Sequence, residues 1–199
     1  MSSLITLGLL PLVGALVVAV LPSGNVLRIK QAALAATVLT AAFGIYLATQ
    51  FEVGQAGLQF VQKYRWIPTF AINFSVGVDG IALTLIVMSI ILTPIVVLAG
   101  WNESEGGRWS AKVFYILILV LETMMIGVFS ATDVFLFYVI FEAMLIPVYF
   151  LIGGYGSGER AAAAVKFLLY SLFGGLLMLA SIIGIFVITS NAGYASFDV

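Results

Sequence analysis

Six long apolar runs constrain this chain more than any other feature of its sequence. Each run is close to the length of about 20 residues that an α-helix needs to cross the hydrocarbon core of a bilayer. Of the 199 residues, 63% are hydrophobic and only 9% are charged, whereas an ordinary soluble domain carries about 25% charged residues. This excludes a water-soluble globular fold. We expect membrane spans at residues 4–21, 32–48, 81–100, 113–130, 134–153 and 161–189.

The connection at residues 50–78 follows a different pattern. Residues 70–77 alternate between large apolar side chains and small or polar ones, which is the period of a β-strand. Residues 58–66 are also strand-like, and Pro68 separates the two segments. Because an open hairpin in lipid would leave its edge groups unpaired, we place it outside the bilayer. The predicted fold is a single all-α polytopic domain over residues 1–199, with about six transmembrane helices and one extramembrane β-hairpin-like loop.

The basic residues are distributed unevenly between the two ends of the predicted spans. Loops on the cytoplasmic side of a membrane protein carry an excess of Lys and Arg. Only Lys63 and Arg65 lie on the side of the hairpin. We therefore expect the N-terminus and the hairpin outside, and the opposite loops in the cytoplasm. The other six basic residues lie in or beside those loops, and they are Arg28, Lys30, Arg108, Lys112, Arg160 and Lys166.

The residue types that are missing exclude several kinds of site. The chain has no Cys and no His, so it cannot form a disulfide, ligate an iron–sulfur cluster or hold a haem through histidine. Its net charge of −1 does not match a basic nucleic-acid-binding surface. We expect no metal site and no cofactor on this chain. The glycine-rich segment 153–158 follows a helix rather than a strand, so we interpret it as a flexible connection and not as a phosphate-binding loop.

Two carboxylates within the predicted spans are the main candidates for chemistry. Glu122 and Glu142 are each flanked by apolar residues, and an ionisable side chain near the bilayer centre costs about 2.5–3.5 kcal/mol on insertion scales. Such residues are functional candidates by default, although each could instead form a structural hydrogen bond between helices. Tyr138 and Tyr149 fall within about 40° of Glu142 around the helix axis and extend it into a polar stripe. Both glutamates lie roughly 14–16 Å from the turn that joins their helices, so a shared-proton pair is one hypothesis.

Other polar residues near the span ends have simpler interpretations. Lys166 lies about one turn inside the sixth span with Tyr170 four residues later, and it either takes part in proton transfer or extends to the headgroups. Asp79 and Asp133 each precede a predicted helix, where a carboxylate caps free backbone N–H groups. We interpret both aspartates as helix caps.

Three motifs resemble a known family. They are the segments Phe74–Ile81, Asp133–Gly153 and Lys166–Gly174. Together they resemble the antiporter-like membrane subunits of respiratory complex I, of the chain M or subunit 4 type. The resemblance implies that Glu142 is the family's essential glutamate on the fifth helix and that Lys166 is a family lysine at the start of the sixth. Family members have about fourteen spans, so six spans correspond to the N-terminal part of a longer pattern.

The resemblance also implies a function. It predicts a proton-translocating subunit of an NADH:quinone oxidoreductase in the inner membrane, with other membrane subunits, lipid and protons as its partners. NADH, FMN, iron–sulfur clusters and quinone are then expected on partner subunits. The alternatives are a subunit of a multi-subunit cation/proton antiporter and a purely structural membrane scaffold.

Overall fold

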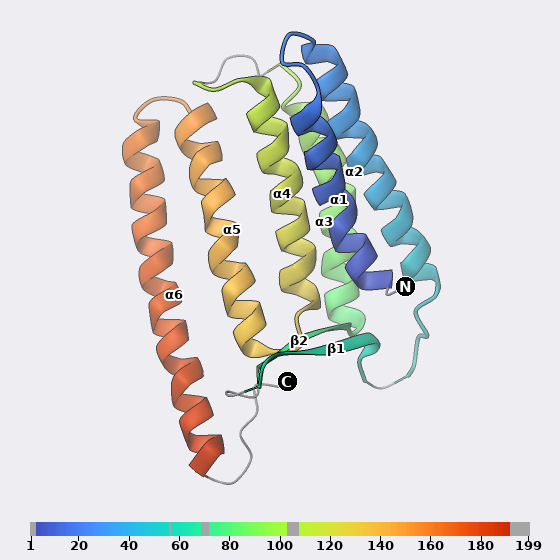
Figure 1. Cartoon of the computed structure of the whole chain (residues 1–199), viewed down its shortest axis with the longest axis vertical. Coiled ribbons are helices and arrows are strands. Elements are labelled where there is room, and N and C mark those ends of the chain that lie inside the picture. Colours follow the sequence, from blue (N-terminus) through green and yellow to red (C-terminus); the bar gives the residue numbers. More distant parts are fainter. Residues whose placement is uncertain (1–2, 56, 69–71, 103–107, 192–199) are drawn as a thin grey trace.

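The residues that the structure describes fold into six long helices and one small sheet. A computed structural model describes residues 3–55, 57–68, 72–102 and 108–191. All six helices are long and apolar enough to cross a membrane, as the sequence predicts. The two strands, β1 and β2, lie across one end of the helices (Figure 1). The helices are α1 (Ser3–Val20), α2 (Val26–Thr49), α3 (Gly80–Ala99), α4 (Ala111–Ser130), α5 (Val134–Tyr155) and α6 (Arg160–Asn191).

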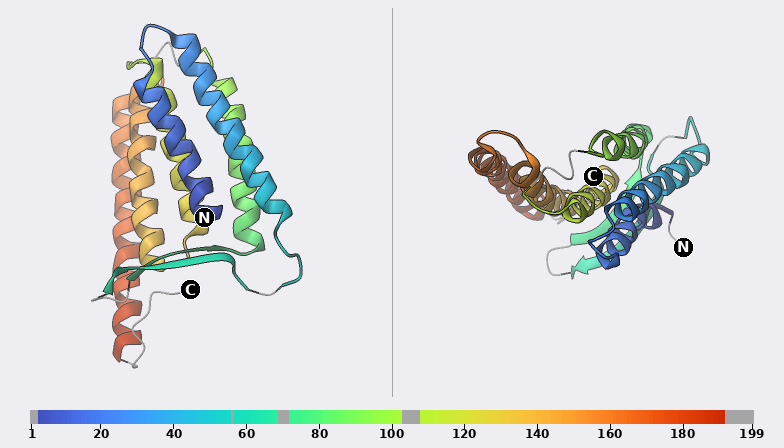
Figure 2. Two further views of the ribbon diagram at one scale, coloured as in Figure 1. Left: turned by 45° about the vertical axis from the view of Figure 1, so that its right-hand side comes forward. Right: turned by 90° about the horizontal axis from the view of Figure 1, so that it is seen from above.

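The helices form two groups that share α4. Helices α1 to α4 pack into a bundle in which α1 contacts both α2 and α4. Helix α5 packs against α4, and α6 packs against α5 on the side away from the bundle. The view from above shows α5 and α6 extending as a pair from the α1–α4 bundle (Figure 2).

The bundle has two apolar clusters at different levels. One cluster joins the end of α1 to the start of α2 and α4 through residues such as Val18, Ile29 and Tyr115. The other lies toward the hairpin and includes Leu4, Val78 and other residues of α1 to α4. Since Leu4 and Val78 share this cluster, the start of α1 and the hairpin lie at the same end of the molecule.

The predicted hairpin is present as β1 (Gln59–Ile67) paired antiparallel with β2 (Ile72–Val78). Strand β2 is attached to the turn between α4 and α5. The Thr132 N–H donates to Ser75 O at 2.9 Å, and the two hydroxyls of these residues lie 2.6 Å apart. The Asn73 N–H donates to Asp133 Oδ2 at 3.0 Å. The α4–α5 turn is therefore held on the edge of the sheet.

Both predicted aspartate caps are confirmed. Asp79 accepts from the Ala82 N–H at 2.7 Å at the start of α3. Asp133 Oδ1 accepts from the N–H groups of Phe135 and Leu136, each at 3.0 Å, at the start of α5. Asp133 is completely buried. It accepts three backbone hydrogen bonds, two from its own helix and one from the sheet.

Two basic residues that we predicted in the first loop lie in a helix. Helix α2 begins at Val26 because Asn25 caps it, accepting from the Arg28 N–H at 3.3 Å. Arg28 and Lys30 are therefore in its first turns. Lys30 is only 4% exposed, and its Nζ lies 5.4 Å from the ring centre of Trp101.

The glycine-rich segment at the end of α5 also differs from the prediction. Gly153, Gly154 and Tyr155 are helical and not part of a flexible connection. Gly154 packs directly against the ring of Trp109, where a side chain would clash, and the Tyr155 hydroxyl donates to Ser110 O at 2.7 Å. These contacts with the start of α4 extend α5 by two residues beyond the predicted end.

Candidate functional site

Glu142 lies near the middle of α5 on the face that packs against α6. A Cβ atom placed on Gly175 of α6 would overlap Glu142 Oε1 and would lie 2.6 Å from Cδ and 3.3 Å from Oε2. Oε1 is buried and has no hydrogen-bond partner among the described residues. The carboxyl group therefore occupies the α5–α6 interface, directly against the backbone of α6.

The predicted polar stripe of α5 lies on this same interface. Tyr138 packs with Met178 and Phe186 of α6 around a small apolar cluster. Tyr149 is half-buried and falls about 20° from Glu142 around the helix axis. On the other side of α5, Ile140 lies against Gly127 of α4, with Cδ1 3.3 Å from the position of a Cβ there. The stripe therefore faces α6 rather than α4.

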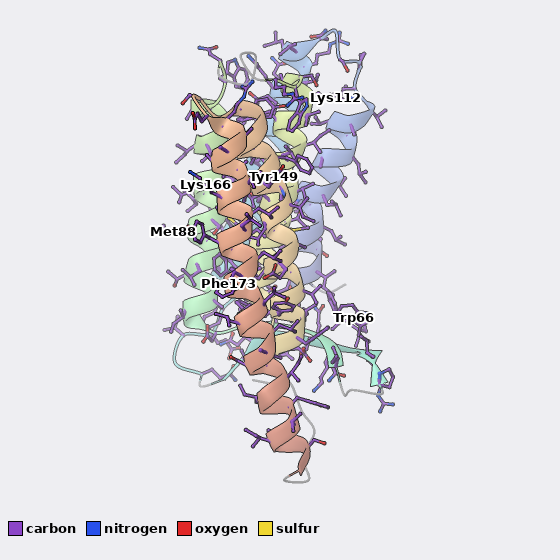
Figure 3. All side chains as sticks on the ribbon, turned by 90° about the vertical axis from the view of Figure 1, so that its left-hand side faces the viewer. Trp66, Met88, Lys112, Tyr149, Lys166 and Phe173 are labelled. Atoms are coloured by element: carbon purple, nitrogen blue, oxygen red, sulfur yellow. The ribbon has the colours of Figure 1, made fainter. Side chains whose placement is uncertain are left out.

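Lys166 and Tyr170 lie on the outer face of α6. Ala164 marks the inner face, because it is buried and lies against Gly153 of α5. At 100° per residue, Lys166 and Tyr170 are turned roughly 160° and 120° away from Ala164. Both are exposed, Tyr170 by 79%. Figure 3 looks onto α6 and shows Lys166 near the same end of the molecule as Lys112. The structure does not bring Lys166 or Tyr170 to Glu142.

Glu122 is completely enclosed in the α1–α4 bundle. It lies on α4 between Leu119, which approaches Gly14 of α1, and Ile126, which approaches Gly8. Both of its carboxyl oxygens are buried without a hydrogen-bond partner among the described residues. Such a site is compatible with a neutral carboxylic acid, because burial of an unpaired ionised carboxylate has a far larger free-energy cost.

Buried polar side chains on two other helices occupy the same level of the bundle as Glu122. Thr37 and Thr40 of α2 lie between the two apolar clusters, as Thr93 of α3 does, and all three are almost fully buried. Each donates its hydroxyl to a carbonyl of its own helix, so its oxygen can still accept a hydrogen bond. The sequence alone does not reveal this polar layer, because a threonine within an apolar run is not unusual on its own.

The hypothesis of a shared-proton pair is wrong for this structure. Glu122 and Glu142 lie on different helices at similar depth, but Glu122 faces α1 to α3 and Glu142 faces α6. The depth of a residue in the membrane follows from the number of residues between it and the turn. The direction in which its side chain faces depends on which neighbours its helix packs against. The two glutamates are therefore separate candidate sites.

The site is compatible with proton transfer. A carboxyl group can bind and release a proton at the same oxygen atom. Of the two glutamates, Glu142 is less enclosed than Glu122. Among the residues that the structure describes, no group of three His, Cys, Asp or Glu side chains is placed to hold a metal ion.

Two protein-family models match the chain. The model described as NADH-ubiquinone oxidoreductase chain 4, amino terminus, matches residues 9–128. The model described as NADH:quinone oxidoreductase/Mrp antiporter, TM, matches residues 131–198. Together they extend from the middle of α1 to the end of α6 and beyond.

Curated relatives match nearly all of the chain. NADH-quinone oxidoreductase subunit M of Mycobacterium tuberculosis is 42% identical over 219 residues, which cover 96% of this chain and 40% of the relative. NADH-ubiquinone oxidoreductase chain 4 of Marchantia polymorpha is 38% identical over 96% of this chain and 38% of the relative. The chain thus spans about two fifths of the length of these relatives.

Solved structures share the fold at lower sequence identity. A chain of respiratory complex I from Thermus thermophilus with bound NADH has a TM-score of 0.80 at 24% identity, covering 98% of this chain and 38% of that one. A chain of the Mrp complex from Dietzia sp. DQ12-45-1b has a TM-score of 0.73 at 19% identity, covering 96% of this chain and 20% of that one.

Proposed function

Because the chain belongs to the NADH-ubiquinone oxidoreductase chain 4 family, we propose that it is a proton-translocating, non-redox membrane subunit of an NADH:quinone oxidoreductase. In this role electron transfer on other subunits drives proton movement, and this chain supplies protonatable groups within the membrane. NADH, flavin, iron–sulfur clusters and quinone are then bound by partner subunits, and the chain packs against other membrane subunits of the complex.

The observation that carries the proposal is the position of Glu142. Its carboxyl group lies between two membrane-spanning helices, with Oε1 buried and without a partner among the described residues. A structural glutamate normally satisfies its oxygens with hydrogen bonds. A carboxyl group that must bind and release a proton is better served by a site without a fixed partner, because a strong permanent hydrogen bond would favour one protonation state.

Removal of the chain tests the function directly. In inverted membrane vesicles from cells that lack it, we expect NADH oxidation by the soluble acceptor ferricyanide to continue, because the redox groups lie on other subunits. NADH-driven acidification of the vesicle lumen is expected to fall to the level of vesicles treated with an uncoupler, and the wild-type gene should restore it. If NADH-driven acidification persists while cation-dependent collapse of a pH gradient is lost, the chain is an antiporter subunit. If both activities persist, neither of them requires this chain and the proposed function is wrong.

We further propose that the chain lies in the inner membrane with its N-terminus and hairpin outside. Arg28, Lys30, Lys112 and Arg160 lie at the opposite end of the helices from the hairpin, in support of the positive-inside orientation.

Single cysteines report this orientation without background, because the chain has no native cysteine. A membrane-impermeant thiol reagent applied to intact spheroplasts is expected to label Gln55→Cys, which lies before the hairpin, and not Ser157→Cys, which lies between α5 and α6. Inverted vesicles should give the opposite result. Labelling of Ser157→Cys only from the outside would contradict this orientation and indicate the opposite one.

A further inference from the structure

Gly175 forms the surface against which the Glu142 carboxyl group rests. It is buried in α6, eleven residues after Ala164 and seven before Ile182, and these three residues mark the face of α6 that packs on α5. Any β-carbon at this position would overlap the carboxyl group of Glu142. The adjacent Gly174 is exposed, and no atom lies within 4 Å of a Cβ placed there. The two adjacent glycines thus differ in burial, and only Gly175 contacts Glu142.

Helix α5 alone does not fix the carboxyl group. The glutamate side chain has three rotatable bonds, and Oε1 has no hydrogen bond to a described residue that would hold it. The contact with α6 therefore limits where the group can lie. We propose that Gly175 is a positioning residue for proton transfer, and that its missing side chain sets the place of the Glu142 carboxyl group between α5 and α6. This inference rests on the proposed proton-translocating function.

A substitution at Gly175 is expected to move the carboxyl group and leave the fold intact. The atoms that a new methyl group would meet are the end of a flexible side chain and not backbone. Alanine is also the better helix former, so the substitution does not weaken α6. Proton transfer requires donor and acceptor within hydrogen-bond reach, and displacement of a reacting group by about 1 Å can reduce a rate on the order of 100-fold.

The test compares Gly175→Ala with the matched control Gly174→Ala in the full-length chain within its native membrane complex. We expect Gly175→Ala to reduce proton pumping per NADH oxidised on the order of 10- to 100-fold. Gly174→Ala should retain the wild-type rate. The infrared C=O stretch of protonated Glu142, identified by its loss in Glu142→Gln, should shift in Gly175→Ala and not in Gly174→Ala. Wild-type pumping and an unshifted band in Gly175→Ala would overturn the inference.

A shorter acid provides the decisive second variant. Glu142→Asp retracts the carboxyl group by one methylene, which makes room for the methyl group of Gly175→Ala. We expect the double variant to pump faster than Gly175→Ala alone, because the loss in Gly175→Ala arises from its contact with the carboxyl group of residue 142. If Gly175→Ala and the double variant both fail to assemble, Gly175 serves helix packing only and the inference is wrong. The proposed function fails separately, if Glu142→Gln pumps normally.

Discussion

Replacement of Glu142 by glutamine is expected to reduce proton pumping by the assembled complex about 100-fold or more, the contribution typical of a positioned proton-transfer group. Glutamine preserves the length and shape of the side chain, so the contact with Gly175 and the packing of α5 on α6 remain. It cannot release and rebind a proton at the same atom. The measurement is lumen acidification per NADH oxidised in inverted vesicles, with the amount of assembled complex determined in parallel.

Two further glutamine variants make this result specific. Glu159→Gln changes an exposed carboxylate just before α6 and should pump like the wild type. Glu122→Gln tests the second buried carboxyl group, which lies in a separate part of the bundle; a loss there with assembly retained supports a role for Glu122 in proton transfer. If Glu142→Gln prevents assembly, a structural role for Glu142 is favoured, and wild-type pumping in that variant contradicts its role as a proton carrier.

Replacement of Asp133 is expected to weaken the attachment of the hairpin to the α4–α5 turn. Asp133→Ala removes the acceptor of three backbone N–H groups, two in α5 and one at Asn73. Loss of a helix cap costs about 0.5–2 kcal/mol, and each buried unsatisfied donor about 1–3 kcal/mol. We expect a total loss of about 2–5 kcal/mol in the free energy of opening this region. Asp133→Asn should lose less, because its Oδ1 can still cap α5.

The rate of cleavage by trypsin reports this opening, because Lys63 and Arg65 lie exposed on β1. Cleavage that proceeds through an opened state follows the population of that state. A loss of 2 kcal/mol therefore increases the cleavage rate of the detergent-purified complex about 30-fold, since each 1.4 kcal/mol is a factor of ten. Asp79→Ala is the matched control, because Asp79 caps α3 through one bond to its own helix. Equal cleavage rates in the two variants would show that Asp133 does not hold the hairpin.

Most of the fold could be predicted from the sequence because each element depends on a local pattern. The length of each apolar run predicts a span, and the period of two near residue 74 predicts a strand. Asp79 and Asp133 could be predicted as caps because a cap bonds only to the next few residues. The difference at Gly154 arises from its contact with Trp109, which is distant in the sequence. Lys30 differs because the Asn25 cap starts α2 before the apolar run that predicted it.

The candidate site could be predicted only in part. The positions of Glu122 and Glu142 within apolar runs identify them as candidates without any knowledge of their neighbours. Their surroundings depend on the rotation of each helix, which the contacts of all the other helices determine. For the same reason the sequence did not reveal that Lys166 lies on the outer face of α6, or that Gly175 contacts Glu142. Two consecutive glycines in a predicted span indicate that another group can approach the helix backbone closely, but they do not identify that group.

The contact between α1 and α4 has a consequence for biosynthesis. Each helix packs against the helix that follows it, but α1 also packs extensively against α4. Chains are synthesised from the N-terminus, so about 90 residues are added between the end of α1 and the start of its second partner. The first three helices enter the bilayer before the helix that completes their core. Glu122 therefore enters the membrane after Thr37, Thr40 and Thr93, the buried polar residues at its level, and the helices that enclose it are already in place.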